Sequence, residues 1–373
     1  MIGDKSAVRK PLPKFGVFFE PVQYDEKRAG FPVHEWIRRS RWPTKNHSTI
    51  LLILNISIWL IGLARTPDEC RARPTTIRND PVNNLRRAST LLSAVFFVAS
   101  CGGSGGGDNP VVNFSKNSDI PKTGTTNFKG TSRSISYNAD GANVVTSTSA
   151  ISGPNAASAS LETKDGIAVA LRIKAPGANA SFDRDSGDTF TQNGNVIGVV
   201  SANQQNYATI VDGASAGFEY QTFGAWDTGY GSGSGKMAAG SFGAKTAASG
   251  MPNVGTNATY NGASVGYVTY NDGVQASTIS NIVVDTDFAT ATIDSSNTNV
   301  VVLETGATRA DSNLDFNGGG PVSGTGFSAS VSASTTSGTA NGQFYGPTAQ
   351  EVGGTFGLTG GATTYIGSFG ARK

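Results

Sequence analysis

Histidine and cysteine are almost absent from this chain of 373 residues. It contains two histidines, His34 and His47, and two cysteines, Cys70 and Cys101, so none of the four lies after position 101. A Ser-His-Asp triad needs histidine as its base, and zinc sites are built largely from histidine and cysteine. If residues after position 101 bound haem, tyrosine or methionine would have to be the axial ligand of the iron, which is less common than histidine. We therefore expect no enzyme, no metal site and no cofactor in this part of the chain.

Basic charge is also scarce outside the N-terminal part. Of the 29 lysines and arginines, 16 precede Cys101, whereas only 8 of the 27 acidic residues do. The rest of the chain thus has 13 basic and 19 acidic residues, a formal net charge of −6. Nucleic-acid binding requires a basic surface. The charge distribution therefore excludes nucleic acid as an expected partner.

Residues 82–100 have the pattern of a lipoprotein signal peptide. Arg86-Arg87 precede an apolar run that ends in the small residues Ala99-Ser100, directly before Cys101. A basic region, an apolar run and a small-residue cleavage site are typical of secretory signals. Residues 98–101 resemble the lipobox of bacterial lipoproteins, which implies acylation of Cys101 and a membrane anchor. A buried core cysteine is the alternative, but the glycine-rich residues that follow are typical of a flexible tether, which we place at 101–112.

Residues 1–81 differ from the rest in composition. They hold 4 of the 48 glycines and 3 of the 4 tryptophans. The apolar stretch 49–64 is shorter than the roughly 20 residues of a membrane span, and Arg38-Arg39 begin a twin-arginine pattern that continues poorly. Because a complete signal-peptide pattern follows these segments, an earlier signal-like segment would be redundant. We predict that residues 1–81 are an upstream extension outside the native protein, which N-terminal sequencing of the precursor tests.

Residues 113–205 predict a handle-like β region. Short apolar runs alternate here with turn signals, and Asp165-Gly166 between Leu161 and Ile167 is a strong hairpin signal. The carboxylates of Asp183–Asp188 invite comparison with a calcium loop, but the glutamate expected at the twelfth position is missing. A solvated turn is the favoured interpretation.

Residues 206–373 alternate with period two, as in Phe327–Ser334, where every apolar residue faces one side and every serine the other. Abundant glycine suits coiled strands. We expect strands near 216–226, 238–246, 255–261, 264–271, 278–294, 323–334, 339–346, 352–359 and 363–371. The fold class predicted is all-β, an eight-stranded antiparallel up-and-down barrel preceded by the smaller handle-like region. A membrane-spanning barrel would need a lipid-facing apolar band, and the serine faces disfavour it.

Several motifs in the predicted barrel resemble one family, the transferrin-binding protein B-like β-barrel lipoproteins. They occur in the family's order, at residues 220–226, 250–262, 285–288, 342–356 and 367–371. The length leaves room for one lobe, with 113–205 as its handle. The resemblance implies a lipid-anchored outer-membrane or surface protein that binds an iron-carrying protein, haem or another small solute for iron or haem acquisition. Gly102, directly after the cysteine, fits outer-membrane sorting.

Candidate contact residues are the tyrosines near expected turns, Tyr230, Tyr270 and Tyr345, because tyrosine suits partner surfaces. Ordinary packing at strand ends is the alternative for each of them. Residues 229–237 superficially resemble a phosphate loop but lack its required residues. Asp285 and Asp287 share a strand face, where solvated acids are the ordinary case. The alternative function is a structural or adhesive surface lipoprotein with no small-molecule ligand.

Overall fold

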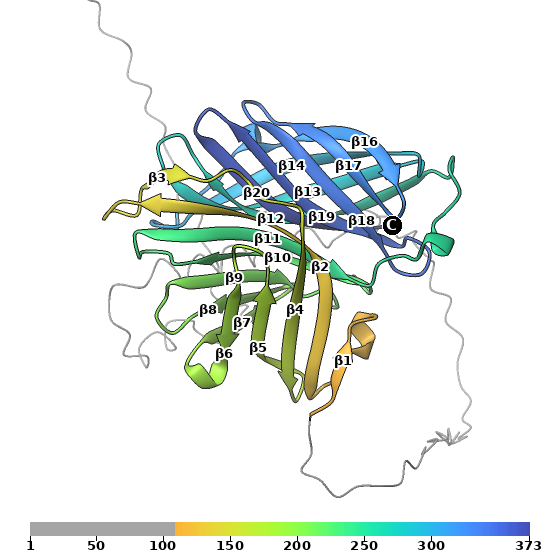
Figure 1. Cartoon of the computed structure of the whole chain (residues 1–373), viewed down its shortest axis with the longest axis horizontal. Coiled ribbons are helices and arrows are strands. Elements are labelled where there is room, and N and C mark those ends of the chain that lie inside the picture. The colour runs from red at the N-terminus through yellow and green to blue at the C-terminus, as the bar shows by residue number, and fades with distance from the viewer. Residues whose placement is uncertain (1–108) are drawn as a thin grey trace, which may run out of the picture. The chain divides into compact units, whose positions relative to one another are not determined.

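The computed structural model describes residues 109–373, in which the regular secondary structure is β-strand with a few short 3₁₀ turns. Residues 1–81, the predicted signal peptide at 82–100 and Cys101 lie outside the described residues, so the expectations for them stay predictions. The strands form two sheets (Figure 1), the handle sheet, β1–β11, and the barrel, β12–β20. Within the described range, no helix has the length and apolarity needed to cross a membrane.

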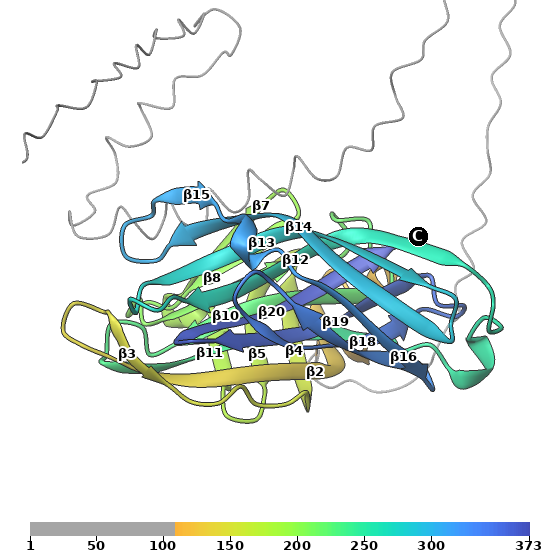
Figure 2. The ribbon, with the colours of Figure 1, turned by 90° about the horizontal axis from the view of Figure 1, so that it is seen from above.

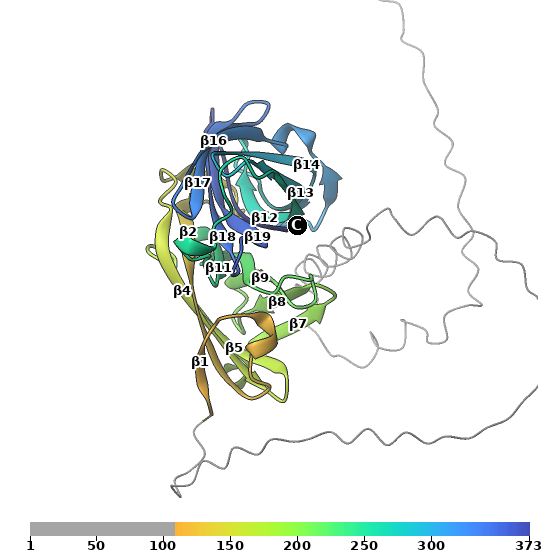
Figure 3. The same ribbon diagram turned by 90° about the vertical axis from the view of Figure 1, so that its right-hand side faces the viewer.

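The barrel closes from eight antiparallel strands, seen along their length in Figure 2 and end-on in Figure 3. Each strand pairs with the next along the chain, and the last pairs with the first. They are β12 (Ala258–Thr269), β13 (Gln275–Thr286), β14 (Thr290–Val302), β16 (Asn317–Ser323), β17 (Gly326–Ser332), β18 (Ser337–Tyr345), β19 (Glu351–Gly360) and β20 (Thr363–Arg372). The short β15 (Thr308–Ala310) pairs with β14 outside this ring. The predicted up-and-down barrel is confirmed.

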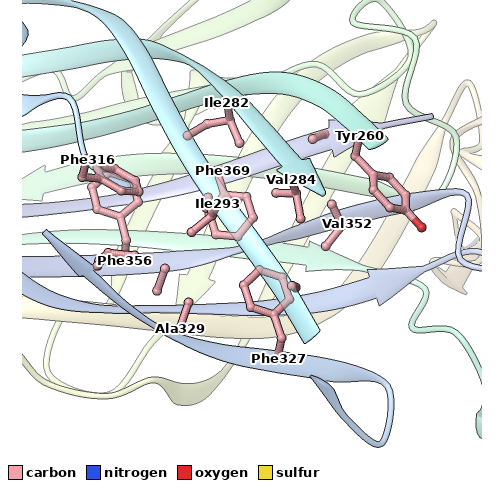
Figure 4. Packing of buried hydrophobic residues seen from close by; sticks show 14 of the residues in the cluster. Tyr260, Ile282, Val284, Ile293, Phe316, Phe327, Ala329, Val352, Phe356 and Phe369 are labelled. Carbon is pink, nitrogen blue, oxygen red and sulfur yellow. The ribbon is translucent and has the colours of Figure 1, made fainter. Parts of the chain in front are cut away.

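Side chains fill the barrel interior (Figure 4). Phe356 is central to this packing, with ring centroids 4.7 Å from Phe316 and 4.9 Å from Tyr365. On β17, Phe327, Ala329 and Val331 are buried while the serines between them are exposed, as the alternation predicted. Eight strands enclose a lumen about wide enough for side chains, and here aromatic rings occupy it.

The handle sheet curls into a second, nearly closed barrel. Its long central strand β2 (Gly124–Ala139) pairs with four others: β1 (Val111–Asn113), β3 (Val145–Thr148), β4 (Asn155–Lys164) and β11 (Ser234–Gly243). The remaining strands are β5 (Ile167–Lys174), β6 (Ala180–Asp183), β7 (Thr189–Asn193), β8 (Val196–Val200), β9 (Asn206–Val211) and β10 (Gln221–Thr228). The predicted Asp165-Gly166 hairpin joins β4 to β5, with both turn residues at positive φ.

The assignment of two strands to the barrel was wrong. The strands expected near 216–226 and 238–246 correspond to β10 and β11, which pair with β9, with each other and with β2 in the handle sheet. The ring of the barrel therefore begins at Ala258 instead of near 206. Alternation shows that a segment is a strand, but it carries no information about which sheet the strand joins.

Some boundaries inside the barrel also differ. The segment 278–294, expected as one strand, turns at Asp287–Ala289, where Phe288 adopts φ 61° and the Thr286 hydroxyl accepts a hydrogen bond from its N–H. The break expected between 261 and 264 does not exist, because β12 runs through it. The alternation missed β16, since Gly318–Gly320 carry no side chains that reveal a face.

The β10–β11 hairpin packs against both halves of the molecule. On one face, Trp226 and Ala238 lie in the handle interior. On the other face, Ala225 and Met237 belong to a second buried cluster that includes Val265 and Ile366 of the barrel, among others. This shared hairpin fixes the relation between the handle sheet and the barrel wall.

Candidate functional site

Turns from both sheets meet where β2, β10 and β12 end. The backbone N–H of Ala139 donates to the Gly233 carbonyl at 2.8 Å, and that of Val145 donates to the Gly273 carbonyl at 2.9 Å. The β2–β3, β10–β11 and β12–β13 turns (139–144, 229–233 and 270–274) thus form one continuous surface, which we call the turn face. Two of the three candidate tyrosines lie on it.

Tyr230 lies in the β10–β11 turn and is partly buried. Its ring packs edge-on against that of Tyr207, with centroids 5.7 Å apart, and its backbone N–H donates to the Gln205 carbonyl. Burial raises the pKa of the Tyr230 phenol to about 12, with smaller contributions from Tyr207 and Glu304. The phenol is therefore neutral at physiological pH and offers both an apolar face and a polar tip.

Tyr270 precedes the β12–β13 turn and is held by two residues from the segment after β14. Its hydroxyl donates to the Asp311 carboxylate at 2.7 Å, and the Arg309 guanidinium lies 5.0 Å from its ring centroid. The Arg309 side chain is about half exposed. Stacking on the Tyr270 ring restricts the Arg309 side chain before any partner arrives, which lowers the entropy cost of binding.

Tyr345 does not join the other two tyrosines. It is fully buried, and its hydroxyl shares a 3.0 Å hydrogen bond with the Ser241 hydroxyl of β11. The expectation that Tyr345 contacts a partner therefore has no support in the described surface, because the β11 strand of the handle covers this position. Here the packing alternative holds.

The two acidic motifs place one carboxylate each in a turn: Asp285 lies in β13 but Asp287 lies in the turn after it, and Asp183 ends β6. Asp287 accepts hydrogen bonds from the backbone N–H groups of Thr290 and Ala289, which lower the pKa of its carboxyl. Asp183 caps a short 3₁₀ turn by accepting from the Asp185 N–H at 3.0 Å. Among the described residues, no group of three or more histidine, cysteine or acidic side chains is placed to hold a metal.

Two buried acids between the handle and the barrel were not singled out from the sequence. Asp227 of β10 is fully buried, which raises the pKa of its carboxyl well above the usual value, and it accepts a hydrogen bond from the Tyr137 hydroxyl at 3.0 Å. Burial also raises the pKa of Glu351 to about 7. Hydrogen bonds from the backbone N–H groups of Glu219 and Tyr220 have the opposite, smaller effect and lower it. Nothing in the local sequence distinguishes these acids from solvated ones.

In the described part of the chain, two of the hollows outside the barrel lumen are lined by the handle and differ in character. A small apolar cavity of about 70 Å³ lies inside the handle sheet, between Phe128, Leu171 and Phe242 among others. A larger cleft of about 450 Å³ lies between the handle and the outer wall of the barrel, near Arg372 and away from the turn face. The sequence predicted neither, because each is assembled from strands far apart in the chain.

The barrel matches a known family. Residues 251–373 match the family model described as the C-lobe and N-lobe β-barrels of Tf-binding protein B. The chain therefore carries a β-barrel of the transferrin-binding protein B-like type, as the sequence motifs indicated. The match begins just before β12 and so covers the closed ring, without the handle sheet.

Solved structures of transferrin binding protein B are similar at low identity. A variant from Haemophilus parasuis is 12% identical, with a TM-score of 0.35, covering 71% of this chain and 78% of that one. The protein from serogroup B Neisseria meningitidis is also 12% identical, with a TM-score of 0.32 and the same coverages. A variant from Actinobacillus pleuropneumoniae is 13% identical, with a TM-score of 0.33, covering 66% and 98%. The comparison with curated proteins gave no match.

Proposed function

We propose that this protein is a non-catalytic binding protein of the outer membrane or cell surface, anchored by lipid on Cys101, that takes part in iron or haem acquisition. The observation that carries the proposal is the match of residues 251–373 to the barrels of Tf-binding protein B. The described residues carry no histidine or cysteine, which disfavours the common catalytic constellations.

An iron-carrying protein is the favoured partner, because the barrel lumen is filled by side chains and leaves small solutes no room there. The turn face offers Tyr230, Tyr270 and Arg309, the residue types that dominate binding energy at protein interfaces. We propose that Tyr270 and Arg309 form the centre of this contact. Both come from the barrel, and the adjoining Tyr230 comes from the handle.

The binding experiment uses the complete mature protein, residues 101–373 in this proposal, immobilised on a sensor, with iron-loaded transferrin, iron-free transferrin and haem as probes. We expect one of them to bind saturably and the Tyr270→Ala variant to weaken that binding at least tenfold, because truncating a residue at the centre of an interface costs about 2 kcal/mol or more. Lys129→Ala, on an exposed position of β2, is the matched control. Unchanged binding by Tyr270→Ala would remove the turn face from the proposal.

The lipid anchor is tested separately from the ligand. Labelled palmitate should be incorporated into the wild-type chain in the exporting cell, and the Cys101→Ser variant should remain unlabelled. Failure of all three probes to bind an acylated protein would favour the alternative, a structural or adhesive surface lipoprotein. The serine-rich outer face of β17 is the feature that favours this alternative.

A further inference from the structure

The cleft between the handle and the barrel has the size and lining of a ligand site. Its volume of about 450 Å³ falls within the range of small-molecule pockets. One wall comes from the handle, from β9, β10 and the segment 212–220 between them together with Asn195. The other wall comes from β12, β13, β14 and the end of β20. We propose that this cleft binds a small solute that carries a carboxylate and several hydroxyl groups.

Arg372 supplies the positive charge. It ends β20, where its backbone pairs with Asn261 of β12 and Glu351 of β19. Its side chain forms no hydrogen bond or ion pair with another described residue, although its positive charge lowers the pKa of Glu351. Its guanidinium lies against Gly217, where an added Cβ would be 3.1 Å from Nη2. A positioned guanidinium whose N–H groups are not hydrogen-bonded to a carboxylate is suited to bidentate binding of a ligand carboxylate.

The neighbouring acids are already supplied with donors of their own. Glu351 accepts hydrogen bonds from the backbone N–H groups of Glu219 and Tyr220. Asp212, at the handle side, accepts from the Ser215 hydroxyl at 2.6 Å and from the Gln192 amide at 3.0 Å. Neither carboxylate forms an ion pair with Arg372, so the guanidinium hydrogens remain available to a ligand.

Lys373 and three amide side chains also line the cleft. The Lys373 ammonium lies over the Tyr260 and Phe288 rings, 5.4 and 5.7 Å from their centroids. Asn195, Asn261 and Asn281 all face the cleft, and none of their side chains hydrogen-bonds to another described residue. Asn281 lies at the irregularity between β13 and β14, and its Oδ1 is buried without a donor. Leaving a buried acceptor unpaired is unfavourable, and a ligand hydroxyl would supply the missing hydrogen. Amides both donate and accept, as recognition of hydroxyl groups requires.

An apolar wall completes the site. Phe218 and Phe223 pack edge-to-face, with centroids 5.8 Å apart, and line the cleft beside Ala216. This surface fits the carbon face of a ring, whereas an entirely apolar ligand would leave Asn281 unpaired. A cationic ligand would be repelled by Arg372. A sugar acid satisfies all three surfaces.

The test is isothermal titration calorimetry of the complete mature protein with D-glucuronate, D-glucose and acetate. Glucuronate should bind. Glucose should bind at least tenfold more weakly because it lacks the carboxylate, and acetate should do the same because it lacks the hydroxyl groups. The Arg372→Gln variant should bind glucuronate at least tenfold more weakly than wild type. The control variant, Lys129→Gln, should bind glucuronate as tightly as wild type. Asn261→Ala, at an exposed position, provides a second variant expected to weaken binding without disturbing the fold.

Two results would overturn the site: absence of glucuronate binding at millimolar concentration, or equal affinity in wild type and Arg372→Gln. Glucose binding as tightly as glucuronate would remove the role of Arg372. The cleft and the turn face are tested with different probes, so failure of the protein-partner proposal leaves this result unaffected.

Discussion

Asp227 and Glu351 show how burial changes ordinary acids at the residue scale. Both lie between the handle sheet and the barrel, and burial is the largest cause that raises the pKa of each carboxyl. A group that holds its proton more tightly in the folded chain stabilises the fold below its unfolded pKa and loses that contribution as pH rises through its folded pKa. For Glu351 this window runs from about 4.5 to about 7.

We predict that Asp227→Asn flattens the pH dependence of stability. Asparagine has the shape of the protonated carboxyl and still accepts from Tyr137, but it does not ionise. From pH 4 to pH 8, ionisation of Asp227 should lower the free energy of unfolding of wild type, and Asp227→Asn should escape this loss. The difference in free energy of unfolding, variant minus wild type, should therefore increase over this range, as measured by urea unfolding. Asp285→Asn, at an exposed position, is the control. Parallel pH curves for Asp227→Asn and wild type would contradict the prediction.

At the element scale, close packing of neighbouring strands depends on glycine where the aromatic ring of one strand lies over the backbone of the next. Gly367 of β20 lies beneath the Phe356 ring, and a Cβ added there would lie 2.2 Å from Phe356 Cζ. Phe356 in turn packs against Phe316 and Tyr365. The ring has no free direction in which to move, because the interior is filled.

We predict that Gly367→Ala destabilises the protein by about 1–3 kcal/mol, the usual cost of overpacking a core. Gly141→Ala is the matched control, since an added Cβ there meets nothing within 4 Å. The midpoint and slope of urea unfolding measure both variants. A Gly367→Ala loss no larger than that of the control would show that the Phe356 ring relaxes freely.

At the scale of the whole molecule, the handle sheet covers part of the barrel wall. Val265, Tyr267 and Ile366 belong to strands of the barrel but are buried in a cluster with Ala225 and Met237 of the handle. The closed ring thus has apolar residues on its outer face as well as in its interior. Removing the handle would expose them to water.

We predict that residues 251–373 produced alone bind a fluorescent apolar dye and unfold at a lower urea concentration than the complete mature protein. The double variant Val265→Thr, Ile366→Thr should reduce dye binding by the isolated barrel, because both positions are exposed there. It should destabilise the complete protein, because both positions are buried against the handle. An isolated barrel that unfolds at the same urea concentration as the complete protein would show that the handle contributes nothing to it.

The amino-acid sequence by itself determined the all-β class, the alternation of β17, the hairpin at Asp165-Gly166 and the kind of barrel, because these depend on local periodicity, turn chemistry and motifs. Only the tertiary structure decided that β10 and β11 belong to the handle, that β11 covers Tyr345, and that Arg372 and Asn281 share a cleft. Strand pairing joins residues more than a hundred positions apart, as in the pairing of Asn261 with Arg372 between β12 and β20. Period-two alternation fixes which face a side chain takes, but what lies against that face depends on the partner strand and sheet.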